Sequence, residues 1–165
     1  GADDWARVAA AVASLSQSRI YIDDDSSLSV ADMNAKCRRI RDLGLVVIDY
    51  LQLMQSDRRS DNRTQEVGEI SRGLKLLATE LGVPVICCSQ RNRGPENRQD
   101  KRPMISDLRE SGSIEQDADI VLMIERKEGR DLDLWLRKNR HGYGGEVCLE
   151  LTHDNLYSNF KSRNE

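Results

Sequence analysis

The sequence predicts an open α/β sheet that is mainly parallel, with helices on both faces and antiparallel strands at its carboxyl-terminal end. Two short apolar stretches, residues 43–52 and 83–90, are rich in β-branched residues, and a predicted helix separates them. Such stretches are typical of buried parallel strands, because helices cover both faces of a parallel sheet. Residues 119–125, 132–140 and 146–151 form three further predicted strands without an intervening helix, which favours antiparallel pairing.

The composition is typical of one domain whose core depends on aliphatic side chains. Of the 165 residues, 32% are charged and only 4% are aromatic. The net charge of -3 gives no overall nucleic-acid signature, so such binding would depend on local basic loops. Four cysteines without CxxC spacing, and only two histidines, predict reduced, buried thiols rather than a zinc site. With no signal peptide and no membrane-spanning stretch, we expect a cytoplasmic protein.

Residues 3–16 and 29–43 are predicted to form amphipathic helices. The apolar face of the first comprises Trp5, Val8, Ala9, Val12 and Leu15. Ser29 is the expected N-cap of the second. Between these helices, residues 19–23 are predicted to form a short strand followed by an acidic loop.

The longest predicted helix, residues 64–81, separates the two buried strands. Asn62 and Gln65 resemble a capping box, and Gly82 stands at the usual C-terminal position. Residues 91–118 follow the second buried strand and lack clear periodicity. Irregular segments of this length are either functional loops or disordered surface.

Polar side chains end both buried strands, at Asp49 and at Gln90. A right-handed crossover makes such strands parallel, which places both side chains at the carboxyl edge, where open α/β sheets bind ligands. A carboxylate there can hold Mg²⁺ or its water, and an amide can orient a phosphate oxygen or an attacking water. Two other interpretations stay open, namely a capping role for Asp49 and a structural role for Gln90.

Two cations end one face of the strand predicted at residues 132–140. Alternation places Lys138 and Arg140 on the same face as Leu132, Leu134 and Leu136, just before a glycine-rich turn. Such a pair can bind a phosphate beyond the sheet, and an arginine that acts on a neighbour's nucleotide contributes roughly 10³ to 10⁵ in rate. The alternative interpretation is a solvated strand end.

Residues 106–119 combine charges with a Ser-Gly-Ser hinge. Backbone amides near Gly112, together with Arg109, are suited to contact phosphates. Residues 91–110 hold six basic and four acidic side chains, so a mobile surface loop is the alternative. The sequence contains neither GxxxxGK[ST] nor a GxGxxG after a strand, and a strand-end acid without a phosphate cradle is half of a nucleotide site.

Three segments resemble bacterial replicative DNA helicases of the DnaB type, which have a RecA-like motor domain. The segments are LGLVVIDYLQLM (43–54), SDNRTQEVGEISRGLKLLATELGVPVICCSQRNR (60–93) and KRPMISDLRESGSIEQDAD (101–119). The similarity extends from about Asp4 to Phe160. It implies a RecA-like (P-loop NTPase) fold that is truncated at its amino-terminal side, with residues 1–160 as a partial motor domain and 161–165 as a frayed tail.

The resemblance implies nucleotide-binding roles for five residues. Asp49 matches the Walker B aspartate that supports Mg²⁺ at ATP, and Gln90 matches the residue that couples the phosphate state to the DNA loop. Lys138 and Arg140, with Asn139 between them, match the pair that reaches the ATP of the adjacent subunit. The HGYGG turn after Arg140 differs from the family's more usual Asn-Gly-Pro.

Arg109, Glu110 and Gly112 match the loop that grips the single-stranded DNA backbone. The implied protein is an ATP-dependent hexameric helicase that moves along single-stranded DNA, unwinds duplex DNA and works with a primase and a helicase loader. The family's phosphate loop and catalytic glutamate would precede Gly1, so this chain alone is expected to be an inactive fragment. A non-catalytic RecA-like module that binds DNA or a partner is the alternative.

Overall fold

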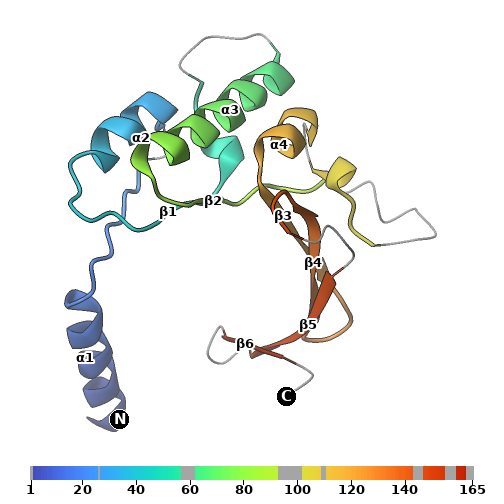
Figure 1. The fold of residues 1–165 in the computed structure, drawn as a ribbon. Coiled ribbons are helices and arrows are strands. Elements are labelled where there is room, and N and C mark those ends of the chain that lie inside the picture. Colours follow the sequence, from blue (N-terminus) through green and yellow to red (C-terminus); the bar gives the residue numbers. More distant parts are fainter. Residues whose placement is uncertain are drawn as a thin grey trace.

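The described part of the chain forms two separate sheets, one parallel and one antiparallel. The computed structural model describes residues 2–25, 27–56, 62–92, 102–108, 111–142, 147–154 and 159–162. The helices are α1 (Ala2–Ser16), α2 (Val30–Cys37), α3 (Arg63–Leu81) and α4 (Ser111–Asp117), with 3₁₀ turns at Leu51–Leu53 and Ile105–Asp107. The strands are β1 (Val46–Ile48), β2 (Val85–Cys87), β3 (Ile120–Arg126), β4 (Asp131–Asn139), β5 (Val147–Asp154) and β6 (Asn159–Ser162). Strands β1 and β2 pair with each other, and β3 to β6 form a four-stranded sheet in sequence order (Figure 1).

Strands β1 and β2 run parallel, as the sequence predicts, with Val46 opposite Val85. Helices α2 and α3 lie over one face of this pair (Figure 1). The core beneath them consists of Ile48, Leu51, Met54, Val67, Ile70, Leu74 and Leu77. On the opposite face Val47 and Ile86 are more than half exposed, so the described helices cover only one side of β1 and β2.

Side-chain caps define the starts of α2 and α3. Ser29 Oγ accepts a hydrogen bond from the Asp32 N–H, and the Asp32 carboxylate accepts one from the Ser29 N–H, both at 3.2 Å. This reciprocal pair is a capping box, which satisfies two backbone donors at the helix start. Asn62 caps α3 by accepting from the Thr64 N–H at 3.0 Å, and Gly82 ends the helix at a φ of 66°.

Helix α2 ends at Cys37 rather than near Leu43. The Arg38 N–H still bonds four residues back, to Asn34 O at 3.0 Å, but the next two bond three residues back, from Arg39 to Lys36 O at 3.1 Å and from Ile40 to Cys37 O at 3.0 Å. This 3₁₀-type pattern tightens the chain and ends the α-helix.

Two further segments differ from their predicted structure. The sequence predicts a strand at residues 19–23, but they lie outside every sheet of the described chain. A strand needs a neighbour to bond its backbone, and none of the described residues provides one here. Conversely, the segment predicted as irregular contains the turn at 105–107 and helix α4.

Helix α1 extends away from the rest of the described chain (Figure 1). Its predicted helical structure is confirmed. However, the apolar side chains of Trp5, Val8, Val12 and Leu15 are all more than half exposed, so this stripe packs on no described core. Among the helices that the structure describes, none is both long and apolar enough to cross a membrane.

The antiparallel sheet buries the face of β4 opposite to the predicted one. Asp133 and Trp135 are 7% and 8% exposed, whereas Leu134 and Leu136 are only half-buried. The buried face forms a second core of Leu108, Val121, Met123 and Trp135, against which Ile105 and Ile114 pack. The alternation of leucines predicts that the Leu132–Leu134–Leu136 face is buried. The tertiary contacts of Trp135 bury the other face instead.

Polar partners allow this face to be buried. The Trp135 Nε1–H donates to Glu125 Oε2 at 3.0 Å. Lys127 Nζ lies 3.0 Å from that oxygen and 3.2 Å from Asp133 Oδ2. The Arg137 guanidinium lies over the Trp135 ring, 4.6 Å from its centroid. Because each of these charges is paired, their burial costs far less than that of an isolated ion.

Strand β6 pairs with β5 and is not predicted by the sequence. It includes Lys161 and Ser162, which the sequence predicts to fray, whereas residues 163–165 lie outside the described chain. All four cysteines are free thiols, as predicted. Cys88 is exposed, contrary to expectation, whereas burial raises the pKa of the Cys87 thiol to about 12.

We expect Trp135→Ala to lower the free energy of unfolding by about 3–5 kcal/mol, the usual loss for a buried aromatic side chain. The substitution removes the ring from the second core and leaves Glu125 without its indole donor. Urea denaturation of the chain, followed by circular dichroism, measures this loss. Trp5→Ala is the matched control, because Trp5 is 76% exposed and should cost under about 0.5 kcal/mol. Similar losses in both variants would contradict the assignment of Trp135 to the core.

Candidate functional site

Asp49 and Gln90 lie at the same carboxyl edge of the parallel sheet, as predicted. Asp49 directly follows β1, and the β1 carbonyl of Ile48 accepts from the Cys88 N–H at 2.9 Å. The Cys88 carbonyl in turn accepts from the Leu51 N–H at 2.9 Å, so the two strand ends stay joined beyond the ladder. Both Asp49 and Gln90 are exposed, which leaves their side chains accessible to a ligand.

Gln52 joins these two strand ends, and the sequence does not single it out. Its Nε2–H donates to Ser89 Oγ at 3.0 Å, and its Oε1 accepts from the Gln90 N–H at 3.2 Å. Arg63 at the start of α3 donates to the Gln52 carbonyl at 2.9 Å. The feature of the sequence that points to Gln52 is its position three residues after Asp49. An amide there lies opposite the end of the neighbouring strand.

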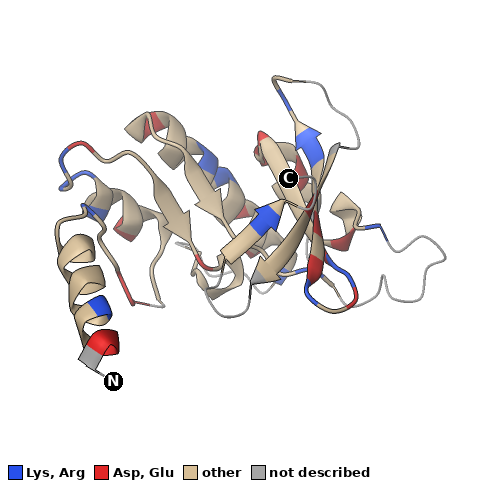
Figure 2. Cartoon of the chain, turned by 90° about the horizontal axis from the view of Figure 1, so that it is seen from below, with Lys and Arg blue, Asp and Glu red and all other residues tan. Residues whose placement is uncertain are grey.

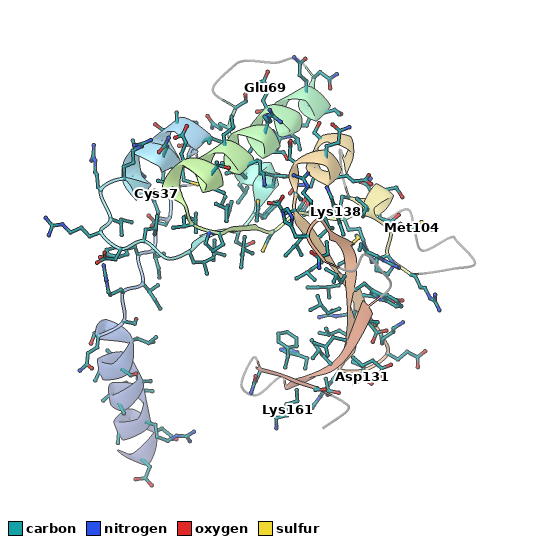
Figure 3. All side chains as sticks on the ribbon, viewed as in Figure 1. Cys37, Glu69, Met104, Asp131, Lys138 and Lys161 are labelled. Atoms are coloured by element: carbon teal, nitrogen blue, oxygen red, sulfur yellow. The ribbon has the colours of Figure 1, made fainter. Side chains whose placement is uncertain are left out.

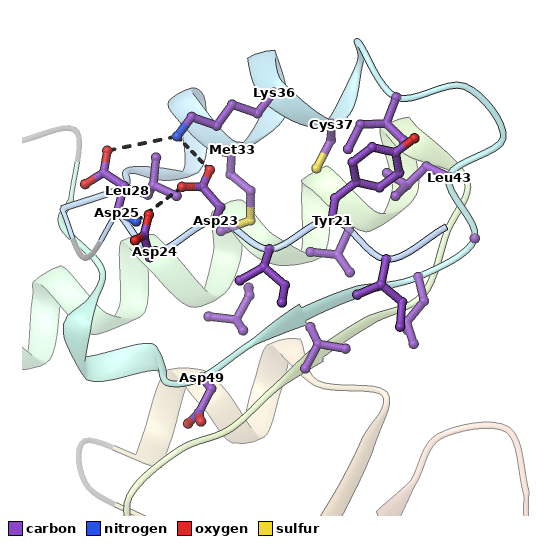
Figure 4. Close-up of a pocket in the computed structure, with 18 of the residues that line it drawn as sticks. Tyr21, Asp23, Asp24, Asp25, Leu28, Met33, Lys36, Cys37, Leu43 and Asp49 are labelled. Atoms are coloured by element: carbon purple, nitrogen blue, oxygen red, sulfur yellow. Dashed lines mark hydrogen bonds and ion pairs between the residues drawn. The ribbon is translucent and has the colours of Figure 1, made fainter. Parts of the chain in front are cut away.

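A hollow of about 820 Å³ lies beside Asp49, between β1 and the segment 19–25 (Figure 4). Of the predicted site residues that the structure describes, Asp49 alone is among its lining residues. Lys36 Nζ pairs across the hollow with Asp23 Oδ2 at 2.6 Å, so hydrogen bonding from Lys36 lowers the pKa of Asp23. Within the described ranges no group of three or more acidic, histidine or cysteine side chains is placed to hold a metal ion. Most of the lining consists of apolar side chains, among them Ile20, Met33 and Val47, so the hollow is mainly an apolar groove that Asp49 borders.

The segment after Gln90 is bridged to the segment before Arg109. Arg91 pairs with Leu108 in an antiparallel bridge, and the Asn92 N–H donates to the Asp107 carbonyl at 2.7 Å. Leu108 is buried in the second core. The chain that leaves the parallel sheet therefore contacts the chain that enters the predicted DNA loop.

The predicted DNA loop is only partly described. Arg109 and Glu110 lie outside the described residues. Gly112 is exposed, but it belongs to the first turn of α4 rather than to an irregular loop. Basic and acidic residues are interspersed over the ribbon in the view from below (Figure 2), which agrees with the absence of an overall nucleic-acid signature in the sequence.

Lys138 and Arg140 both contact the C-terminal end of α4 (Figure 3 labels Lys138). Lys138 Nζ donates to the carbonyls of Glu115 and Gln116. Arg140 Nη2 donates to the Gln116 carbonyl at 2.6 Å, and its Nη1 lies 3.2 Å from Asp119 Oδ1. The two cations therefore share one face, as the alternation predicts. Helix carbonyl ends carry partial negative charge, which favours this arrangement.

Asn139 lies between these cations and against the following turn. A Cβ at Gly142 would lie 2.2 Å from Asn139 Nδ2, so any larger residue there would displace the Asn139 side chain. No hydrogen bond or ion pair among the described residues joins Asp49 or Gln90 to Lys138 or Arg140. The site residues thus form two groups. The strand-edge group consists of Asp49 and Gln90, and the cationic group on α4 consists of Lys138 and Arg140, which lie at the end of β4 and contact that helix.

Known proteins of one family are similar to this chain in sequence and in fold. The DnaB-like helicase C-terminal domain family matches residues 1–162. The replicative DNA helicase DnaC of Bacillus subtilis is 49% identical over 98% of this chain, and the replicative DNA helicase DnaB of Geobacillus stearothermophilus is 50% identical over the same share. In both cases this chain spans 38% of the relative's length.

Two solved structures have the same fold. A DnaB-like replicative helicase, studied for its interactions with primase, superposes with a TM-score of 0.86 at 38% identity over 97% of this chain and 41% of the other. A second solved structure, of an ATPase domain, superposes with a TM-score of 0.86 at 39% identity, over 96% of this chain and 60% of the other. The predicted α/β class with a parallel sheet and antiparallel carboxyl-terminal strands is confirmed. The described residues do not form one mainly parallel sheet, because the antiparallel strands β3 to β6 make a sheet of their own beside the parallel pair.

Proposed function

Because this chain belongs to the DnaB-like helicase C-terminal domain family, we propose that it is part of an ATP-driven replicative helicase that unwinds duplex DNA. Residues 1–160 contribute to the motor domain, which assembles as a homo-hexamer and moves along single-stranded DNA. The observation that carries the proposal is the bridge between Arg91 and Leu108. It joins the strand end proposed to sense the nucleotide to the segment that leads into the proposed DNA loop.

Among the described residues at the strand edge, Asp49 is the one suited to hold a magnesium ion. Its carboxylate is exposed at the end of β1, and it accepts no hydrogen bond and forms no ion pair with the described residues. Protein sites hold Mg²⁺ through one or two carboxylates together with substrate phosphates and water. Bound Mg²⁺ would neutralise charge on the phosphates of ATP. Asp49 would orient that ion or its water.

Gln90 is the proposed relay between nucleotide and DNA. Its backbone N–H is fixed by Gln52, while its side chain is exposed at the ligand edge. A movement of Gln90 passes directly to Arg91, and from Arg91 across the bridge to Leu108. Leu108 leads into Arg109, Glu110 and Gly112, which are the residues proposed to contact the DNA backbone.

Lys138 and Arg140 are proposed to act on the ATP of the adjacent subunit, with Asn139 holding the turn. The Arg140 side chain is 40% exposed, and a guanidinium has five N–H donors. Gln116 and Asp119 engage only part of them, so Arg140 retains donors for a phosphate. The similar helicase studied with primase supports a primase partner, and the family resemblance alone supports a loader.

We expect Gln90→Ala to lower the stimulation of ATP hydrolysis by single-stranded DNA roughly tenfold in the full-length protein, the scale of a lost coupling between sites. ATP binding should persist, because the substitution changes only an exposed side chain. Hydrolysis with and without single-stranded DNA, together with unwinding of a forked duplex, measures the effect. Gln17→Ala is the matched control, since Gln17 is exposed just after α1.

Full DNA stimulation in the Gln90→Ala variant would contradict the relay. A full-length protein that binds DNA but hydrolyses no ATP would instead favour a non-catalytic DNA-binding module.

A further inference from the structure

Helix α4 lies between the proposed DNA loop and the proposed phosphate-binding cations. It begins at Ser111, directly after Arg109 and Glu110, and its carbonyl end holds both Lys138 and Arg140. A helix of this length spans about 10 Å. One short, hydrogen-bonded element therefore follows the proposed DNA loop at one end and contacts the proposed phosphate-binding cations at the other.

Asp119 adds a charged contact just beyond this helix. Its Oδ1 lies 3.2 Å from Arg140 Nη1, and its carbonyl accepts from the Arg140 N–H at 2.8 Å. Its Oδ2 accepts from Lys75 Nζ of α3 at 2.5 Å. Hydrogen bonding from Lys75, supported by the charge of Arg140, lowers the pKa of Asp119, so this carboxylate is ionised at neutral pH.

The ion pair is the main constraint on this oxygen. Asp119 Oδ1 is shielded from solvent and has no hydrogen-bond partner among the described residues, so the Arg140 charge is its compensation. Arg140 is thus held on both sides, by the carbonyl of Gln116 on α4 and by Asp119 after it. A displacement of α4 must therefore move the guanidinium.

We propose that α4 is a rigid link that passes movement of the DNA loop to Lys138 and Arg140, and that Asp119 is the positioning residue that fixes Arg140 to this link. The inference rests on the proposed function, because it takes its roles for the loop and for the cations from there. It adds a direct path within one subunit from DNA to the nucleotide of the next subunit. Gln90 reaches the same link from the other side, through Arg91 and Leu108.

Helix α4 packs against α3, and α4 would move relative to this longer helix. A Cβ on Gly68 of α3 would lie 2.7 Å from Ser113 Oγ, so the two helices approach closely at this glycine. Arg72 of α3 pairs with Asp117 at 3.8 Å, which is looser than the pair of Lys75 with Asp119 at 2.5 Å. Asp117 and Asp119 thus both tie the end of α4 to α3, but only Asp119 contacts Arg140.

This difference provides a matched test in the full-length protein. Asp119→Asn should lower the stimulation of ATP hydrolysis by single-stranded DNA roughly tenfold, since small misplacements of catalytic groups have effects of this size or larger. Asp117→Asn weakens the other tie of this helix end to α3 but leaves every contact of Arg140 in place, so stimulation should stay within about twofold of the unmodified protein. Asp119→Glu keeps the charge and should retain most of the stimulation. Binding of a non-hydrolysable ATP analogue, unchanged in all three variants, shows that they fold.

Unaltered stimulation in Asp119→Asn, or equal losses in Asp117→Asn and Asp119→Asn, would overturn the inference. Equal losses in Asp119→Asn and Asp119→Glu would overturn the ion-pair mechanism. The Arg140→Ala variant distinguishes failure of the proposed link through α4 from failure of the proposed function. Near-normal hydrolysis in Arg140→Ala would refute the proposed role of Arg140 itself, whereas loss in Arg140→Ala with full stimulation in Asp119→Asn would refute the link alone.

Discussion

Replacing Arg140 by alanine in the full-length protein should lower ATP turnover by roughly 10³- to 10⁵-fold, the contribution of an arginine that stabilises phosphoryl transfer from a neighbouring subunit. ATP binding should persist, because Arg140 belongs to the cationic group on α4 and not to the strand edge with Asp49. Steady-state hydrolysis and equilibrium binding of an ATP analogue measure the two quantities separately. Arg140→Lys should restore little, since an ammonium lacks the planar fork that matches a phosphate.

Arg130→Ala is the control for Arg140→Ala. Arg130 lies in the turn between β3 and β4, at the opposite end of β4, and it is exposed. Turnover should stay near that of the unmodified protein. An Arg140→Ala variant with near-normal turnover would contradict the assignment of Arg140, and a variant that loses ATP binding as well would point to a structural role.

Asp49→Asn should lower ATP turnover of the full-length protein by roughly 10²- to 10³-fold, the usual loss when one electrostatic contact to a transition state is removed. The substitution keeps the size of the side chain and removes only its charge, so the exposed end of β1 should keep its structure. A neutral amide is a poorer ligand for Mg²⁺ than a carboxylate. The residual hydrolysis should therefore need a higher Mg²⁺ concentration, which a magnesium titration of the rate measures.

Asp24→Asn is the control for Asp49→Asn, because Asp24 is an exposed acid that lines the same hollow (Figure 4). Its rate and magnesium dependence should match those of the unmodified protein. If Asp49→Asn shows the same magnesium dependence as the unmodified protein, Asp49 does not hold the metal ion.

Local sequence patterns predict the strand-edge group well. The apolar stretches that end in Asp49 and Gln90 form parallel strands whose ends meet, and Ser29, Asn62 and Gly82 delimit helices as their chemistry requires. These features depend on residues close in sequence or on the usual crossover between parallel strands. The roles of Asp49 and Gln90 stay predictions.

Tertiary contacts decide the features that the sequence does not predict. Helix α4 begins Ser-Gly-Ser, which favours irregular structure, and it is held by Lys138 and Arg140 from a distant strand. Trp135 buries the polar face of β4 because Glu125 accepts its indole N–H. Sequence patterns do not reveal Gln52 and Asp119 for the same reason, since their partners lie far away along the chain. Residues 19–23 show the converse, a strand pattern without a described partner strand.

The shared nucleotide site is the central claim, and photo-crosslinking across the subunit interface tests it most directly. A photo-reactive amino acid in place of His141, which is exposed and adjacent to Arg140, leaves the proposed phosphate-binding pair intact. Irradiation of the full-length protein with a bound ATP analogue should join two subunits, and peptide mapping should connect position 141 to the nucleotide site of the other subunit. Crosslinks confined to position 141 and its own chain, with no product of two subunits, would contradict the account.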